Sequence, residues 1–199
     1  MEKKPLITIG VTCFNASKTI SRALDSAISQ NWPNFEIIIV NDFSNDNSLE
    51  IVQSFAKINK KIKVINHKKN MGCAHSRNNI IKNSKGEFIT FFDDDDVSLP
   101  NRLSFQYERI INYENFSKTK LIACYSSGLR IYPNKYIKEF VAVGAFGLSI
   151  IGKEMSDYLL FNKKSKNLIY GSGTPTCSLM ARKEVFKKVG DFDPNLSRQ

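Results

Sequence analysis

The first half of this 199-residue chain alternates between short apolar runs and stretches with the apolar spacing of an amphipathic helix. The apolar runs cover residues 6–13, 35–40, 62–65 and 87–92. The run FEIIIV at 35–40 is apolar at nearly every position, as expected for a strand buried on both faces of a sheet. Strands and helices that alternate at this spacing predict an α/β fold, a mostly parallel twisted sheet with helices on both faces and right-handed crossovers.

The second half is less regular. A helical stripe follows Pro100, residues 121–127 and 176–180 are predicted strands, and a short helix at 182–189 ends at Gly190. Residues 133–170 show little periodicity, so no element is predicted there. The expectation is a single domain over 1–199, with a nucleotide-binding half at 1–97 and a partner-binding half at 98–199.

The net charge of +10 suits anionic partners, namely nucleotides, phospholipid headgroups or nucleic acid. Residues 98–199 carry most of this excess, with 16 Lys and Arg against 8 Asp and Glu. No apolar run approaches the ~18–20 residues that span a bilayer, no signal peptide is recognised, and the four cysteines form no paired motif. We therefore expect a cytoplasmic protein, with peripheral contact at the inner face of the membrane as a further hypothesis.

Polar side chains follow three of the predicted strands at the point where each strand ends. In a parallel sheet, ligands bind beyond these carboxyl ends, so the side chains are candidates for one shared site. They are Thr12 and Asn15 after the first strand, with the aromatic Phe14 between them, Asn41, Asp42, Ser44 and Asp46 after the second, and Asp93, Asp94, Asp95 and Asp96 after the fourth.

The acidic run at 93–96 is the sharpest of these features. Like charges at this spacing raise a carboxyl pKa unless a cation is present. Carboxylate oxygens of this kind suit Mg²⁺ or Mn²⁺, which take one or two carboxylates together with substrate phosphates. If the strand continued, alternation would place Asp93 and Asp95 on one side. The alternative is a solvated acidic turn or a helix cap before Pro100.

Three further residues have both a ligand-binding and a structural interpretation. Asp42 would accept a hydrogen bond from a base ring N–H, or form a turn and cap the next helix. Phe14 would stack on a base, or belong to the core. Arg77 would bind a diphosphate through paired hydrogen bonds, or lie on the polar face of its helix. His67 and His75 show no metal-ligand spacing and receive no role.

These motifs together resemble glycosyltransferase family 2, the large inverting group with the GT-A fold, and the resemblance covers essentially the whole chain. ITIGVTCFNASKTISRALDSAISQ is similar to the family's first strand, turn and helix, and VNDFSNDNS to its VDDGSTD segment, with Asn41 and Phe43 as departures. NMGCAHSRNNIIKNSKGEFITFFDDDD resembles NxGxxxARNxGixxAxGxyixfLDxDD, which places the DxD signature at residues 93–95.

The resemblance implies transfer of a sugar from a nucleoside-diphosphate sugar, most often UDP-linked, with inversion, to a saccharide or lipid-linked acceptor in surface polysaccharide synthesis. It implies that Thr12 and Phe14 contact the base and that Asp42 pairs with it. Asp93 or Asp94 would hold the ribose. Asp95, with Asp93 beside it, would bind Mn²⁺ or Mg²⁺, which bridges the diphosphate and stabilises the leaving charge.

VGDFDPNL resembles the family's GGFDExL segment, which precedes the Glu-Asp pair that supplies the catalytic base. Asp191 and Asp193 match that segment and not the base, so the resemblance places the base just after Gln199. On this basis the 199 residues are expected to be a C-terminally truncated domain that binds donor and transfers sugar slowly.

Two alternatives remain at this point. A nucleotidyltransferase would carry a Gly-rich phosphate loop near the N-terminus, and none is present. A non-catalytic membrane- or nucleic-acid-binding module would gather its basic residues with aromatics in one stripe, whereas the lysines here are scattered. Nucleic acid is therefore not an expected partner.

Overall fold

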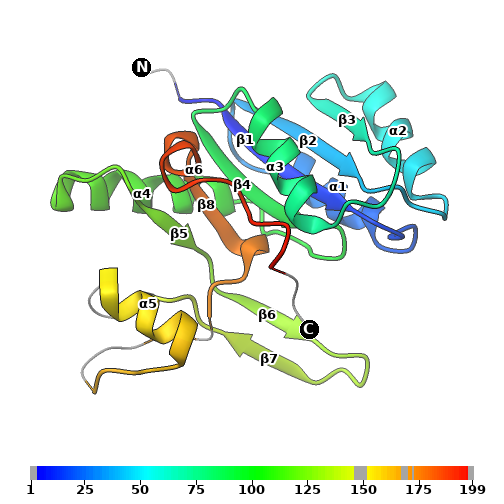
Figure 1. Cartoon of the computed structure of the whole chain (residues 1–199). Coiled ribbons are helices and arrows are strands. Elements are labelled where there is room, and N and C mark those ends of the chain that lie inside the picture. Colours follow the sequence, from blue (N-terminus) through cyan, green and yellow to red (C-terminus); the bar gives the residue numbers. More distant parts are fainter. Residues whose placement is uncertain (1–3, 146–151, 167–169, 172, 197–199) are drawn as a thin grey trace. The chain divides into compact units, whose positions relative to one another are not determined.

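The computed structural model describes residues 4–145, 152–166, 170–171 and 173–196. Their contacts divide the chain into two compact units, one formed by residues up to 124 together with those from 180 onward, and the other by 125–179. The chain thus leaves the first unit after residue 124 and returns to it after residue 179 (Figure 1).

The first unit contains the main sheet and five of the helices. Its elements are β1 (Ile7–Cys13), α1 (Ile20–Ile28), β2 (Phe35–Asn41), α2 (Ser48–Ile58), β3 (Ile62–Asn66), α3 (Cys73–Asn83), β4 (Phe88–Asp93), α4 (Arg102–Ser117), β5 (Ala123–Tyr125), β8 (Leu179–Arg182) and α6 (Lys183–Val189), where β5 and β8 each reach one residue into the second unit.

The six strands lie in the order β3-β2-β1-β4-β8-β5. β3, β2, β1 and β4 are parallel, and β8 is antiparallel to β4. In register, Thr12 of β1 lies opposite Val40 of β2 and Asp93 of β4. The carboxyl ends of the three strands that carry the candidate residues therefore coincide at one edge of the sheet, as predicted.

Helices cover both faces of this sheet (Figure 1). Ile20 and Leu24 of α1, with Leu103 of α4, pack in one continuous core cluster with the inward residues of the strands, and all three are fully buried. On the opposite face α3 lies close to β1, since a Cβ added at Gly10 would come within 2.4 Å of the Ile80 side chain. This close approach packs α3 against the middle of β1, where only glycine leaves room for the Ile80 side chain.

The second unit contains an antiparallel hairpin of β6 (Gly128–Ile131) and β7 (Ile137–Phe140), helix α5 (Gly152–Phe161), and a short 3-10 helix, η1 (Thr176–Ser178). β7 and α5 lie in the segment 133–170, for which the sequence predicted no element, and β6 lies just before it. None of the described side chains of α5 is buried, which explains why its apolar pattern is weak.

Most predicted elements are present with boundaries shifted by a few residues. The larger difference is the segment predicted as a strand at 176–180, which is the short helix η1 followed by β8, whose described pairing lies at residues 180–182. Among the described residues, no helix is both long enough and apolar enough to cross a bilayer.

Candidate active site

The turn after β1 is joined to the ends of β2 and β4 by hydrogen bonds. The Phe14 N–H donates to Asp94 Oδ2 at 2.9 Å, and the Asn15 N–H donates to Ser44 Oγ at 3.0 Å. Asn15 Oδ1 in turn accepts from the Asn45 N–H at 2.8 Å. Asn15 has φ 51°, in the left-handed region that asparagine tolerates better than most residues, so it turns the chain while bridging the two loops.

The Phe14 ring does not belong to the core, because the residue is 46% exposed. Thr12 is partly buried, and its Oγ1 accepts a weak hydrogen bond from the Cys73 thiol at 3.9 Å. An exposed aromatic ring next to a strand end offers a flat apolar surface for a planar ligand.

The acidic run does not continue β4. The strand ends at Asp93, and Asp94 and Asp95 form a turn, so strand alternation does not govern where the Asp95 side chain points. Asp95 is exposed, and its carbonyl oxygen accepts a hydrogen bond from Arg22 Nη2 at 2.8 Å. The turn is thereby fixed through its backbone while the Asp95 carboxylate faces solvent.

Burial is the largest cause that raises the pKa of Asp94, and with the nearby charges of Asp95 and Asp93, and against the opposing hydrogen bond from Phe14, the pKa reaches about 6. Mutual repulsion of this kind shows that the three carboxylates lie within electrostatic reach of one another. Carboxylate oxygens are ligands that a hard divalent cation prefers, and such a cation would neutralise the repulsion.

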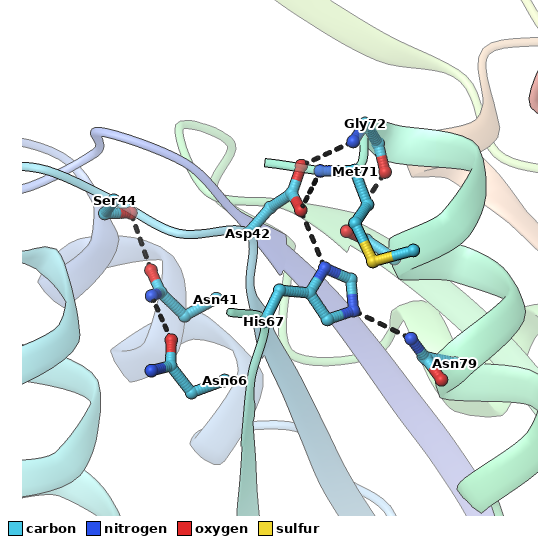
Figure 2. A network of polar contacts seen from close by, with 9 residues as sticks. Asn41, Asp42, Ser44, Asn66, His67, Met71, Gly72 and Asn79 are labelled. Atoms are coloured by element: carbon cyan, nitrogen blue, oxygen red, sulfur yellow. Dashed lines mark hydrogen bonds and ion pairs between the residues drawn. The ribbon is translucent and has the colours of Figure 1, made fainter. Parts of the chain in front are cut away.

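The carboxylate of Asp42 is the centre of a buried network (Figure 2). Asp42 is only 4% exposed. Its Oδ1 accepts from His67 Nδ1 at 2.7 Å and from the Met71 N–H at 2.8 Å, and its Oδ2 accepts from the Gly72 N–H at 2.7 Å. The carboxylate thus anchors the loop that leads into α3, rather than capping α2.

The imidazole of His67 extends this network to α3 (Figure 2). A carboxylate only accepts hydrogen bonds, so Nδ1 of His67 carries the hydrogen and donates it in the bond to Asp42. The other ring nitrogen, Nε2, lies 2.7 Å from Asn79 Nδ2, which donates to it. This tautomer links the end of β2, the end of β3 and the middle of α3 through one buried ring.

A second polar cluster lies next to Asp42 on the same strand ends. Asn41 Nδ2 donates to Asn66 Oδ1 at 2.7 Å, and Ser44 Oγ donates to Asn41 Oδ1 at 2.6 Å. Phe43, which stands where the resembling motif has glycine, has φ 62° and is 45% exposed. The loop therefore keeps a left-handed turn without glycine. Asn41 stands where the family's VDDGSTD segment has its first Asp, and its amide forms a hydrogen bond with Asn66.

Helix α3 directs its polar side chains toward the site edge. Arg77 Nη2 lies 3.7 Å from Asp93 Oδ1, and the Arg77 side chain is 18% exposed.

Asp46, in the loop after β2, is held ionised. Burial opposes its charge, but hydrogen bonds from Ser48 and Ser17 outweigh burial and keep its pKa well below the ordinary range.

The candidates at the ends of β1, β2 and β4 lie at this one edge, with Arg77 of α3 beside Asp93, within the first unit. Asp42, Asp93 and Asp94 are joined to neighbouring site elements by hydrogen bonds or ion pairs. Sequence reasoning missed His67 and Asn79. His67 follows the third apolar run, so the strand-end rule that selected the other residues also applied to it.

The family model of Glycosyl transferase family 2 matches residues 8–190. An uncharacterized glycosyltransferase of Rickettsia typhi is 33% identical over 192 residues, which cover 96% of this chain and 55% of the relative. WfgD of Escherichia coli, named a UDP-Glc:alpha-D-GlcNAc-diphosphoundecaprenol beta-1,3-glucosyltransferase, is 29% identical over 142 residues, 67% of this chain and 55% of its own length. The chain thus spans about half the length of these curated relatives.

Two solved structures show the same fold. Staphylococcus aureus TarS 1-349, in complex with UDP-GlcNAc, superposes with a TM-score of 0.56 at 24% identity, covering 92% of this chain and 47% of that one. The mannosyltransferase PcManGT from Pyrobaculum calidifontis, in complex with GDP-Man and Mn²⁺, gives a TM-score of 0.64 at 14% identity, with 98% and 49% covered. The expected GT-A fold is confirmed, and because the family model matches nearly the whole sequence, this chain belongs to glycosyl transferase family 2.

Proposed function

We propose that this chain binds a UDP-sugar at the carboxyl edge of its sheet and transfers the sugar, with inversion, to a saccharide or lipid-linked acceptor in surface polysaccharide synthesis. The observation that carries the proposal is the acidic turn after β4, which shares one edge with the exposed Phe14 ring and with Arg77. A base platform, a metal-binding set of carboxylates and a guanidinium for phosphate are the parts that such a donor needs.

The base of the nucleotide would lie on Phe14 beside Thr12, with Asn15 holding the turn beneath it. Asp42 Oδ2 accepts one hydrogen bond from Gly72, and a carboxylate oxygen has room for a second. A uracil ring N–H that reached Asp42 Oδ2 would therefore donate to a carboxylate whose orientation is already fixed by its other hydrogen bonds. Asp93 or Asp94 would accept from the ribose hydroxyls.

Asp95 and Asp93 would hold Mn²⁺ or Mg²⁺, which supplies positive charge for the leaving diphosphate when bound. Arg77 would contribute a second positive charge through hydrogen bonds to phosphate oxygens. The protein's own part is to hold these groups rigidly, through the turn hydrogen bonds at Phe14 and Arg22.

The acceptor is inferred from relatives and from charge. The printed name of WfgD specifies a UDP-Glc donor and a GlcNAc-diphosphoundecaprenol acceptor, which supports a lipid-linked diphosphate as the acceptor class. The basic excess of residues 98–199 suits an anionic lipid surface, with peripheral contact as part of the proposal. We assign no catalytic base to the described residues: Asp193 accepts hydrogen bonds from Asn195 and forms a turn.

Base selectivity tests this proposal. Calorimetric titration with UDP, GDP and ADP, each with Mn²⁺, should give tightest binding for UDP. N3-methyl-UDP lacks the ring N–H and should bind roughly 10- to 100-fold more weakly than UDP, the size of one hydrogen bond to a charged group. Equal affinities for UDP and N3-methyl-UDP would contradict the role of Asp42, and equal affinities for all three nucleotides would contradict a uridine donor.

A further inference from the structure

The segment that leaves α6 is tied to α3 by hydrogen bonds to the amide side chain of Asn78. Gly190, with φ 97°, turns the chain out of α6, and residues 190–193 belong to no helix or strand. Asn78 Nδ2 donates to the Phe192 carbonyl oxygen at 2.8 Å, and the Phe192 N–H donates to Asn78 Oδ1 at 2.9 Å. The amide thus pairs with both backbone groups of one residue, as a neighbouring strand would.

This double hydrogen bond fixes the Phe192 ring against the sheet. The ring meets Phe91 of β4 edge-on, with ring centres 5.7 Å apart, and Phe186 of α6 at 6.4 Å. Phe186 in turn meets Phe91 edge-on at 5.9 Å. Three rings from β4, α6 and the following segment form one cluster, whose position depends on where the backbone of residue 192 is held.

The Phe192 ring supports Arg77. The Arg77 guanidinium lies over the ring at 5.6 Å from its centre, and the ion pair with Asp93 is long, at 3.7 Å. Arg77 Nε is buried and has no hydrogen-bond partner among the described residues. A guanidinium with one long ion pair and an unpaired donor is oriented mainly by the surface on which it stacks.

We propose that Asn78 and Phe192 are positioning residues for Arg77: Asn78 fixes the backbone of residue 192, and the Phe192 ring holds the guanidinium beside Asp93 for the diphosphate of the donor. This rests on the proposed function, because Arg77 is taken there as the phosphate-binding group. The segment after α6, far from the donor-binding motifs in sequence, thereby becomes part of the donor site.

The adjacent residue Asn79 provides a matched control. It is the same residue type on the same helix, but its amide contacts His67 and, through it, Asp42. Loss of Asn78 should therefore affect a ligand with phosphates, whereas loss of Asn79 should affect any ligand with a uracil ring. Uridine and UDP distinguish the two effects, since uridine has the base and ribose without the diphosphate.

The test measures the dissociation constants of UDP and uridine, with Mn²⁺ present, for the unaltered chain and for Asn78→Ala, Phe192→Leu and Asn79→Ala. Asn78→Ala and Phe192→Leu should each weaken UDP about fivefold and leave uridine unchanged, the size expected when a guanidinium loses its ring support. Asn79→Ala should weaken both ligands by the same factor.

Amide hydrogen exchange at residue 192 supplies a measurement that is independent of ligand. Asn78→Ala should raise the exchange rate of this amide about tenfold, whereas Phe192→Leu keeps the backbone hydrogen bonds and should leave the rate unchanged. Phe192→Leu also keeps an apolar side chain in the ring cluster, so the ring is tested without loss of the fold.

Two patterns would overturn the proposal. If Asn78→Ala weakens UDP and uridine equally, its effect is general and not directed at phosphate. If Phe192→Leu leaves the UDP affinity unchanged, the ring does not position Arg77. Failure of the proposed function gives a different result, namely no Mn²⁺-dependent UDP binding by the unaltered chain, and the proposal about Asn78 would fall with it.

Discussion

Replacing Asp42 with Asn tests the buried network, because the two side chains have the same shape and differ in charge and in one donor group. The Asp42 carboxylate accepts from three donors, while an Asn amide offers one oxygen in place of two. With the amide nitrogen at the Oδ2 position, the Gly72 N–H loses its acceptor. With the nitrogen at the Oδ1 position, His67 and Asn79 can reverse their roles, but the Met71 N–H loses its acceptor.

Either orientation leaves one backbone N–H without an acceptor next to a residue that is 4% exposed. An unsatisfied buried donor costs about 1–3 kcal/mol, and the remaining hydrogen bonds also lose the strengthening that a charged acceptor gives. We therefore expect Asp42→Asn to lower the free energy of unfolding by about 3 kcal/mol. For a chain of this size that corresponds to a melting temperature lower by roughly 6–12 °C.

Urea and thermal unfolding followed by circular dichroism, without nucleotide, measure this loss. Asp25→Asn makes the same chemical change at an exposed position on α1 and should shift the free energy by less than about 0.5 kcal/mol. If Asp42→Asn is as stable as Asp25→Asn, the carboxylate does not organise the loop before α3, and the account of the network is wrong.

Two further changes test the acidic turn and the packing of α3. The pKa of Asp94 is raised from 3.8 to about 6 in the folded chain, so the folded state binds this proton more tightly than the unfolded state does. In EDTA, the free energy of unfolding should therefore fall as the pH rises from about 4 to above 6. Urea unfolding at pH 5 and at pH 7.5 measures this fall, and Asp94→Asn should abolish it. Gly10→Ala would place a Cβ 2.4 Å from Ile80 and should destabilise the chain by about 1–3 kcal/mol; a variant as stable as the parent would show that α3 does not press on β1.

Much of the site could be predicted because it follows from local pattern. Apolar runs identify the four parallel strands, and the rule that ligands bind at carboxyl ends places Thr12, Asp42 and Asp93 at one edge from the sequence alone. The resemblance to family 2 then selects among the polar residues. Positions in the sequence thus predict which groups gather at the edge.

The orientation of these groups could not be predicted in the same way. Whether a carboxylate faces a ligand or the protein depends on donors from distant segments, and Asp42 meets the N–H groups of residues 71 and 72 and the ring of His67. Pairing of β8 with β4 joins segments about 90 residues apart, and the apolar spacing within either segment does not predict which strand it pairs with. The Asn78–Phe192 hydrogen bonds span 114 residues and escaped sequence reasoning for the same reason.

The most direct test of the central proposal is the affinity of the chain for UDP with Mn²⁺ and with EDTA, measured by calorimetry for the unaltered protein, Asp95→Ala and the exposed-carboxylate control Asp25→Ala. We expect Mn²⁺ to tighten UDP binding about tenfold or more in the unaltered chain and in the control, as for a cation that bridges carboxylates and phosphates, and Asp95→Ala to remove this gain. Equal affinities in Mn²⁺ and EDTA for the unaltered chain would contradict a metal-assisted donor site at the end of β4.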